Sequence, residues 1–230
     1  MELIREYVSE LTKITGLTPV VLPGTDVAVG DIIQFSGKTI LGKPKIGYFQ
    51  NMSSLENLEI KYSIKTADTV SNRVYNSSAG IKVNTELSAE NIVTSDISFS
   101  KEGMVYICAN DVKEYTIANL VKIKSELKPK ITEEIDSCFL VTKLISAESV
   151  VVMQSSQKNG NLKFDTKKII EESGIKSKIN IKSYSGQSYF NDSINNVTLL
   201  MELIEIKFQK EKIKKYSKNY FKIKTNEMID

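Results

Sequence analysis

The spacing of apolar and polar residues changes several times along the chain, and each change predicts a different element. Near the start, apolar residues from Leu3 to Ile14 recur at helical spacing with charged residues between them, and Gly16 follows. This spacing places the apolar side chains on one face of a helix, and glycine commonly ends one. We therefore expect an amphipathic first helix, followed by short buried strands over residues 18–23 and 27–35.

Strict alternation of apolar and polar residues begins at residue 58. Within residues 58–67 apolar side chains alternate with polar ones at positions 58, 60, 62 and 64. Within residues 80–89 they stand at 81, 83 and 87, with Thr85 in the same phase, and Val93, Ser95, Ile97 and Phe99 continue the pattern after a polar break. A period of two is typical of a strand with one buried face. The sequence therefore predicts strands in all three segments, with the polar stretch 66–79 between the first two.

Two segments carry signals that favour helices. Asn110-Asp111 follows the apolar run 104–109 and could cap a helix over residues 112–127, which Pro129 would end. Asp165 could likewise cap a short helix over residues 165–170, with Gly174 after it. We expect a helix at both places.

The second half of the chain is again rich in β-branched residues. The apolar runs 139–145 and 149–154 are separated by three residues only and predict a hairpin. Asn159-Gly160 is the strongest local turn signal in the sequence. A long final strand is expected over residues 197–208. Because strands outnumber helices and short turns join them, we expect an α+β fold with a mostly antiparallel sheet and peripheral helices.

Charge divides the chain unevenly. The formal net charge of the 230 residues is +3, yet residues 209–230 hold seven lysines against three acidic residues. We therefore divide the chain into a strand-rich body, residues 1–208, and a basic segment, residues 209–230. The segment could bind nucleic acid, favour an anionic membrane surface, or form a solvated terminal helix. Its candidate contact residues are Lys210, Lys212, Lys214, Lys215, Tyr216, Tyr220 and Phe221.

Catalytic chemistry has little support in this sequence. It contains no histidine, which is the usual general base and the commonest transition-metal ligand. Phosphate-binding, nucleophile-elbow and paired-cysteine motifs are missing as well. Cys108 and Cys138 lie in apolar runs and are expected to be buried, while Glu133, Glu134 and Asp136 fit a solvated charge cluster better than a Mg²⁺ site. The sequence predicts a protein that is not an enzyme and needs neither metal nor cofactor.

The alternating segments admit two interpretations. Any antiparallel sheet with one wet face shows this pattern. However, segments of about ten alternating residues also match the length of a membrane-spanning strand. The candidate membrane-inserting residues are Leu58, Ile60, Tyr62, Ile64, Ile81, Val83 and Leu87. Apolar runs are too short for a membrane-spanning helix, and the acidic residues near the start are unlike a signal peptide, so we expect a cytoplasmic protein.

The order of several motifs resembles that of a known family. After the first helix come residues 16–23, with the sequence GLTPVVLP, and then Asp31-Ile32-Ile33. In the second half come residues 138–145, a valine-rich strand and the Asn159-Gly160 turn. These features are similar to bacterial gasdermins and to the pore-forming domains of gasdermins in general.

The resemblance implies a gasdermin-like fold and a pore-forming effector. Such a protein is an inactive monomer held by a short C-terminal segment, which an activating protease releases. It then forms a homo-oligomeric pore with membrane lipids, in an inner or plasma membrane. No cysteine precedes Cys108, so the lipidated cysteine near the N-terminus of many bacterial gasdermins has no counterpart here. The alternative is a non-catalytic binding or assembly protein that contacts nucleic acid or another protein through its basic tail.

Overall fold

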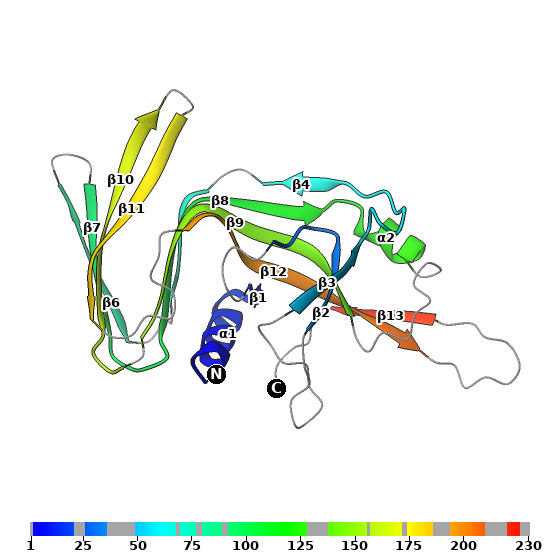
Figure 1. Cartoon of the computed structure of the whole chain (residues 1–230), viewed down its shortest axis with the longest axis horizontal. Helices are drawn as coiled ribbons and strands as arrows, with labels where there is room; N and C mark the ends of the chain where they lie inside the picture. Colours follow the sequence, from blue (N-terminus) through cyan, green and yellow to red (C-terminus); the bar gives the residue numbers. More distant parts are fainter. Residues whose placement is uncertain are drawn as a thin grey trace, which may run out of the picture. The chain divides into compact units, whose positions relative to one another are not determined.

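A computed structural model of the chain is shown in Figure 1. The structure describes residues 2–20, 26–35, 49–67, 70–76, 80–88, 92–127, 138–155, 157–171, 174–185, 194–209 and 220–225. The helices in these ranges are α1 (Glu2–Thr15) and α2 (Leu120–Leu127). The strands are β1 (Thr18–Pro19), β2 (Asp31–Phe35), β3 (Phe49–Ser54), β4 (Ile64–Thr66), β5 (Val70–Asn76), β6 (Ile81–Leu87), β7 (Ile92–Phe99), β8 (Val105–Ile117), β9 (Cys138–Gln154), β10 (Asn161–Glu171), β11 (Gly174–Ser185), β12 (Ile194–Gln209) and β13 (Tyr220–Thr225).

The strands form a nine-stranded sheet and a four-stranded sheet. The larger sheet has the strand order β1-β12-β9-β2-β3, and in it β13 pairs with β12 while β8 pairs with β9, β4 and β5. The smaller sheet has the order β11-β10-β7-β6, and each of its neighbouring strands runs antiparallel. The predicted α+β fold with a mostly antiparallel sheet is confirmed.

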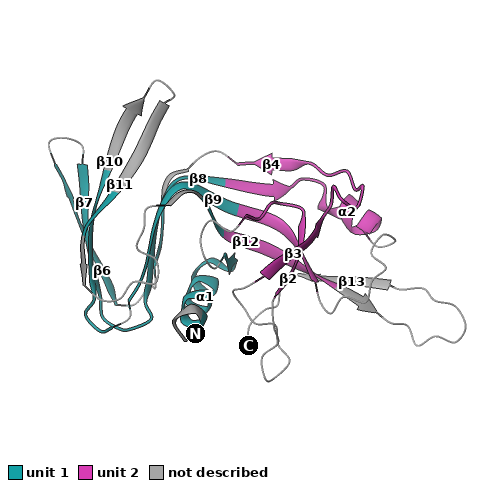
Figure 2. Ribbon diagram, viewed as in Figure 1, with its two compact units in different colours: residues 1–25, 68–113, 145–199 teal, residues 26–67, 114–144, 200–230 magenta. Residues whose placement is uncertain are grey.

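The chain divides into two compact units, which Figure 2 colours separately. Unit 1 comprises residues 1–25, 68–113 and 145–199, and unit 2 comprises residues 26–67, 114–144 and 200–230. The strands β8, β9 and β12 each contribute residues to both units. The division predicted from charge, with a body over residues 1–208 and a basic segment after it, stays a prediction.

The first helix forms as its spacing predicts and belongs to unit 1. Tyr7, Val8 and Leu11 of α1 are buried, because they lie on one face of the helix. At the C-terminal end, Gly16 has a φ of 69° and its amide donates to the carbonyl of Thr12 over 2.8 Å. A left-handed residue that returns a hydrogen bond in this way is the usual end of a helix.

The core of unit 2 contains an aromatic group and the second helix. Phe35 lies between Phe49 and Phe139, with ring centroids 6.5 and 5.2 Å away in edge-to-face geometry. Helix α2 buries Ile123 and Leu127 on one side. In the described ranges, neither helix has the length and apolar content that crossing a membrane would require.

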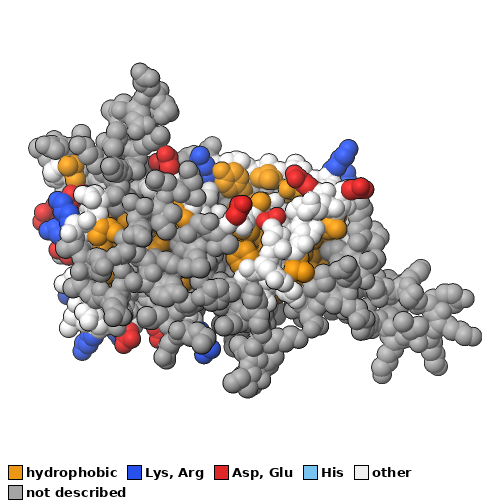
Figure 3. All heavy atoms as spheres, in the orientation of Figure 1, with side chains coloured by type: hydrophobic (Ala, Val, Ile, Leu, Met, Phe, Trp, Pro, Cys, Tyr) orange, Lys and Arg blue, Asp and Glu red, His pale blue; other side chains and the backbone are white. Residues whose placement is uncertain are grey.

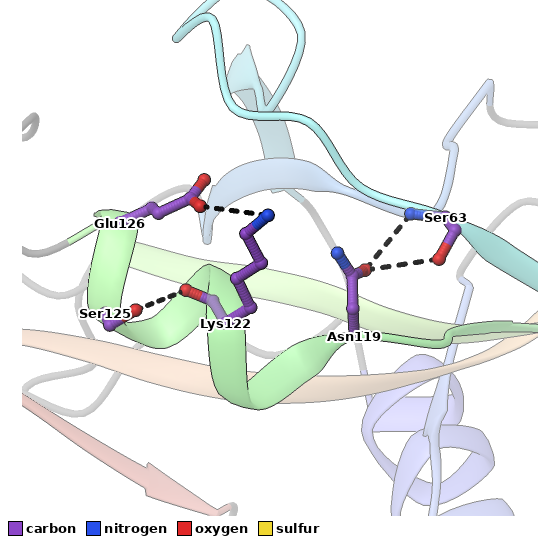
Figure 4. Close-up of polar contacts among 5 residues, drawn as sticks. All are labelled: Ser63, Asn119, Lys122, Ser125 and Glu126. Atoms are coloured by element: carbon purple, nitrogen blue, oxygen red, sulfur yellow. Dashed lines mark hydrogen bonds and ion pairs between the residues drawn. The ribbon is translucent and has the colours of Figure 1, made fainter.

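Polar contacts anchor the start of α2 (Figure 4). The side-chain Oδ1 of Asn119 accepts hydrogen bonds from the amide and the hydroxyl of Ser63, over 3.1 and 3.4 Å. Within the helix, Lys122 pairs with Glu126 over 3.7 Å, and the Ser125 hydroxyl donates to the Lys122 carbonyl. Asn119 therefore fastens the helix to a residue 56 positions earlier in the chain.

The predicted helix over residues 112–127 is wrong in its first half. Strand β8 continues to Ile117, and only residues 120–127 are helical. Asn110 does not cap a helix, because its buried side-chain amide donates to the Ser149 hydroxyl over 3.2 Å. Asp111 takes a φ of 50° but stays within the strand. A partner 39 residues away thus decides the structure of this segment.

Other predictions for the strands also need correction. The hairpin expected over residues 139–154 is a single strand, β9. Of the connecting residues Ser146, Ala147 and Glu148, only Ser146 is of a type common in turns, and none supplies the conformational freedom of glycine or the fixed φ of proline. Of the two early strands, β1 covers Thr18 and Pro19, with residues 21–23 of the prediction outside the described residues, and β2 starts at Asp31 instead of residue 27. The polar stretch 66–79 contains strand β5. By contrast, the long final strand is confirmed as β12.

Candidate functional site

The four-stranded sheet is built from two β-hairpins joined along β7 and β10. In the first hairpin β6 pairs with β7, and the Ser88 amide donates to the Ile92 carbonyl over 2.8 Å where the chain turns. In the second hairpin β10 pairs with β11 along its whole length. The pairing of β7 with β10 runs from Asn161 opposite Ser98 to Lys167 opposite Ile92.

One side of this sheet, which we call the apolar face, carries hydrophobic residues from three strands. Directly paired residues of antiparallel strands share a face, and Val83 pairs with Ile97, which also pairs with Leu162. The members of the apolar face are Ile81, Val83 and Leu87 of β6, Val93, Ile97 and Phe99 of β7, and Leu162 and Phe164 of β10. Thr85 and Ser95 interrupt it at one register position.

Part of the apolar face packs into the core of unit 1. Ile97, Phe99, Leu162 and Phe164 are at most 1% exposed and form one cluster with Met104, Tyr106, Cys108, Val151 and Met153. The rings of Phe164 and Tyr106 lie 6.2 Å apart. Burial raises the pKa of the Cys108 thiol to about 11, so this thiol stays protonated and unreactive at neutral pH.

The remainder of the apolar face is open to solvent. Val83 is 40% exposed and Leu87 is 72% exposed, although both lie on the same face as the buried cluster. Figure 3 shows hydrophobic side chains reaching the surface of the molecule among charged ones. Exposing a leucine to this degree forgoes the burial that usually stabilises such a side chain.

The opposite side, which we call the charged face, carries the residues that alternate with these. Its members with described side chains are Lys82, Asn84 and Glu86 of β6, Ile92, Thr94, Asp96 and Ser98 of β7, Asn161, Lys163 and Asp165 of β10, and Asn180 and Lys182 of β11. The side chains of β6 on this face are all exposed. The sheet is therefore hydrophobic on one side and hydrophilic on the other.

Asp165 connects three strands on the charged face. The Thr94 hydroxyl of β7 donates to its Oδ1 over 2.7 Å, and the Lys182 ammonium of β11 lies 2.6 Å from its Oδ2. Lys182 is the extra residue at a register shift, since Lys163 pairs with Ser183 but Phe164 pairs with Ile181. The hydrogen bond from Lys182, followed by that from Thr94, lowers the pKa of the Asp165 carboxyl below its ordinary value.

The predicted membrane-inserting residues fall into two groups, residues 58–64 and residues 81–87, which have different structures. Ile81, Val83 and Leu87 lie together on the apolar face of β6. Leu58, Ile60, Tyr62 and Ile64 do not share a strand, because residues 55–59 form a turn in which Glu59 has a φ of 56°. Only Ile64 of that group is in a strand, β4, so the ten-residue strand predicted over residues 58–67 is wrong.

The segment around Tyr62 has a packing role of its own. Ile60 is buried, and its amide donates to the Leu55 carbonyl over 2.9 Å. The Tyr62 ring lies against Gly30, where a Cβ would come within 2.9 Å of the ring carbon Cζ. The alternation in residues 58–67 thus reflects a packed turn, and a membrane contact there stays a prediction.

Most of the predicted basic tail lies outside the described residues. Lys210, Lys212, Lys214, Lys215 and Tyr216 are among these, as are the acidic residues 133, 134 and 136. Tyr220 and Phe221 belong to β13, where they pair with Gln209 and Phe208 of β12. The terminal helix considered for this tail is therefore wrong for residues 220–225.

The second hairpin of the site differs from what the sequence predicts. Residues 165–170 were expected to form a helix, but they continue β10, because the Asp165 side chain bonds to neighbouring strands instead of capping. The alternation of Leu162, Phe164 and Thr166 with polar residues was the available signal. Among the described residues, no group of three or more histidines, cysteines or acidic residues could hold a metal ion.

The structure of this chain is similar to solved structures of other proteins. No protein-family model matches the sequence, and no curated protein matches it. The structure is similar to that of the gasdermin A3 membrane pore, with a TM-score of 0.40 and 12% identity over 99% of this chain and 96% of that one. It is also similar to a bacterial gasdermin from Bradyrhizobium tropiciagri, with a TM-score of 0.37 and 13% identity over 96% and 90% of the two chains. Both are gasdermins, the family that the sequence resembles.

Proposed function

We propose that this protein forms pores in membranes. In the proposed mechanism the four-stranded sheet enters the bilayer after the C-terminal segment is released, and several copies assemble around a water-filled passage. The observation that carries the proposal is the sidedness of the sheet. Its apolar face extends beyond the core to Leu87, which is 72% exposed, while its other face is charged.

A two-faced sheet suits a boundary between lipid and water. Inside a bilayer every backbone polar group needs a partner, and hairpins provide partners between neighbouring strands. Membrane-spanning strands alternate apolar and polar residues and need about 9–11 residues. β10 has 11 residues and β11 has 12, whereas β6 and β7 have 7 and 8 and would need to lengthen on insertion.

The two outer strands of the sheet offer a route to assembly. β6 and β11 are the end strands of the order β11-β10-β7-β6, so each has one edge that no strand of that order pairs. Such edges readily pair with another chain. Pairing β6 of one copy with β11 of the next would repeat head to tail, and a repeat that closes gives a ring. The active state is thus a homo-oligomer, and the inactive state a monomer.

The C-terminal strand is the proposed restraint on this assembly. β13 pairs with β12 over six residue pairs, from Ile204 opposite Thr225 to Gln209 opposite Tyr220. It thereby occupies an edge of β12 that would otherwise be open to another chain. Cleavage by a protease between Gln209 and Tyr220 would leave β13 held only by this pairing. The protein would then leave the cytoplasm for an inner or plasma membrane, as an effector of cell death or antiviral defence.

A cleavable full-length protein tests the proposal. A recognition sequence for a site-specific protease is inserted between Gln209 and Tyr220, and a scrambled insertion of the same length serves as the control. We expect release of a neutral dye from vesicles of anionic lipid only after cleavage of the recognition sequence. Intact vesicles after complete cleavage would contradict the proposal. If cleavage abolished salt-dependent binding to DNA or RNA instead, the basic tail would be a nucleic-acid contact.

A further inference from the structure

Unit 2 contains a hollow that the proposed mechanism does not use. The hollow has a volume of about 750 Å³ and is open to the surface. Its lining residues are Glu56, Glu59, Ile60, Lys61, Tyr62 and Ile64. We further propose that this hollow binds a phosphoethanolamine headgroup, the zwitterionic group of a membrane phospholipid. The assignment to a lipid rests on the proposed function, whereas the chemistry of the headgroup follows from the hollow itself.

Two carboxylates line the hollow from a single tight turn. Glu56 and Glu59 are both exposed, and the Glu59 amide donates to the Glu56 carbonyl over 2.9 Å. Ammonium groups bind carboxylates through charge-assisted hydrogen bonds, which are stronger than those between neutral groups. A primary ammonium carries three N–H donors, so one such group can bond to both glutamates.

The Tyr62 ring is a second feature that favours a cation. It is half-buried and lies against Gly30, and the face of a tyrosine ring attracts an ammonium group. Burial, and then the negative charges of Glu56 and Asp31, raise the pKa of the Tyr62 phenol. The hydroxyl therefore stays protonated at neutral pH, and the ring stands in a region of negative potential. A positively charged group is attracted to the same region.

Lysine and isoleucine side chains suit the rest of the headgroup. Lys61 is exposed and lines the same hollow, and a lysine ammonium binds phosphate as a point charge. Ile60, which is buried, and Ile64, which is 47% exposed, provide apolar walls for methylene groups. Two carboxylates against one lysine leave the lining with a negative balance. The hollow thus disfavours a purely anionic ligand and suits one that carries both signs.

The segment that carries these residues is held at both ends within unit 2. At one end the Leu55 amide donates to the Gly30 carbonyl over 3.0 Å, and the Ile60 amide donates to the Leu55 carbonyl over 2.9 Å. At the other end Asn119 accepts two hydrogen bonds from Ser63, as Figure 4 shows. A site that is ordered before its ligand binds loses less conformational entropy on binding. The hollow is therefore formed before the headgroup arrives.

The lining also distinguishes between the two common zwitterionic headgroups. The trimethylated ammonium of phosphocholine has no N–H to donate to Glu56 and Glu59, whereas that of phosphoethanolamine has three. Exposed ion pairs contribute little individually, so we expect a Kd on the order of a millimolar for the isolated phosphoethanolamine headgroup. Binding of the phosphocholine headgroup should be about threefold weaker or more.

The first experiment titrates the uncleaved full chain with glycerophosphoethanolamine and records backbone amide shifts by NMR. The test variant combines Glu56→Gln and Glu59→Gln, which keep the size of both side chains. The control combines Glu10→Gln and Glu102→Gln, which change the net charge equally but lie in unit 1. We expect saturable shifts in residues 60–64 of the original and control proteins, and binding about threefold to tenfold weaker in the test variant.

A second variant isolates the contact with the phosphate. Lys61→Gln should weaken binding of glycerophosphoethanolamine but leave binding of ethanolamine, which has no phosphate, unchanged. Glycerophosphoglycerol, which has a phosphate but no ammonium, should bind to the original protein about threefold more weakly or less well still. If ethanolamine alone bound as tightly as the whole headgroup, the hollow would be a site for free amines and the inference would be wrong.

Vesicles distinguish a lipid from a free headgroup. The uncleaved chain is sedimented with vesicles that hold a fixed fraction of anionic lipid, together with either phosphatidylethanolamine or an uncharged digalactosyl lipid. More protein should sediment with phosphatidylethanolamine, and the Glu56→Gln, Glu59→Gln variant should lose this excess while the control keeps it. Equal sedimentation with both kinds of vesicle would overturn the assignment to a lipid.

These measurements separate the inference from the proposed function, because neither depends on cleavage or dye release. Shifts that do not saturate, or that weaken equally in the test and control variants, overturn the headgroup site while the pore stands. Saturable binding to the headgroup and to the vesicles supports the inference. If the cleaved protein then released no dye, the pore would be excluded and the headgroup site would remain.

Discussion

Strands β9 and β6 use similar residues in opposite ways. Along the 17 residues of β9 almost every side chain is buried, on both faces of the sheet. Along the 7 residues of β6 every side chain after Ile81 is exposed, on both faces. The sequences reflect this difference, because β9 contains continuous apolar runs whereas in β6 the apolar residues Ile81, Val83 and Leu87 are each separated by polar ones. Continuous runs are typical of strands covered on two sides, and alternation is typical of strands covered on one.

The difference shows which strand depends on its present surroundings. Removing β9 from its core would expose side chains such as Leu140 and Val150, which are fully buried. Moving β6 would expose much less, since Val83 and Leu87 already contact solvent, although Ile81 packs against the buried cluster. The free energy of transfer to lipid therefore favours β6, which has apolar surface to bury, and opposes β9.

The largest expected effect is the difference in stability between two leucine-to-alanine variants, one in β9 and one in β6. Leu140→Ala in β9 removes a fully buried side chain and should lower the free energy of unfolding by about 2–5 kcal/mol. Leu87→Ala in β6 removes a side chain that is 72% exposed and should change the free energy of unfolding by about 0.5 kcal/mol or less. Urea denaturation of the uncleaved protein measures both. Equal losses would mean that Leu87 contributes as much to the folded core as Leu140 does.

A charge placed on either face of β6 should separate membrane function from folding. Leu87→Lys puts an ammonium on the apolar face. A lysine that faces lipid near the bilayer centre costs about 2–4 kcal/mol, and each inserted copy of β6 would carry one. Dye release after cleavage should therefore fall at least about tenfold, since about 1.4 kcal/mol corresponds to a factor of ten. Stability in solution should change little, because Leu87 is exposed.

The matched control for this substitution lies on the same strand. Asn84→Lys adds the same charge to the charged face, where the side chain is exposed and would stay in water. Release of a neutral dye should continue at nearly the original rate. If both variants released dye equally well, the apolar face would not be the surface that meets lipid.

Local sequence predicted the elements whose pattern is determined by their own residues. The first helix follows from its apolar spacing, and β6 and β7 follow from alternation. The Asn159-Gly160 turn follows from the ease with which asparagine adopts positive φ, here 61°. The apolar residues of β6 could therefore be selected as a candidate site before the fold was known.

The errors occur where a polar side chain has a distant partner. Asn110 and Asp165 are both good helix caps, and their neighbours in sequence favour that role. In the structure Asn110 bonds to Ser149, and Asp165 bonds to Thr94, 71 residues away. Sequence patterns within a short window contain no information about such partners. The capping signal of Asp165 therefore concealed the second hairpin, and with it half of the candidate site, although the alternation of Leu162, Phe164 and Thr166 continued into it.

The smallest effect should come from the Asp165 contact that joins β7, β10 and β11. Lys182 and Thr94 lower the pKa of this carboxyl below its ordinary value of 3.8. The contact therefore stabilises the folded protein fully when the pH is above 3.8. That stabilisation is lost as the pH falls from 3.8 through the lowered pKa of the folded state. Asp165→Asn should therefore lower the thermal midpoint modestly at neutral pH, and the gap between variant and original should close in acid. Asp96→Asn, an exposed carboxylate on the same face, is the control. If the difference in thermal midpoint between the Asp165→Asn variant and the original protein stayed constant at pH values below 3.8, the charge of Asp165 would not hold the two hairpins together.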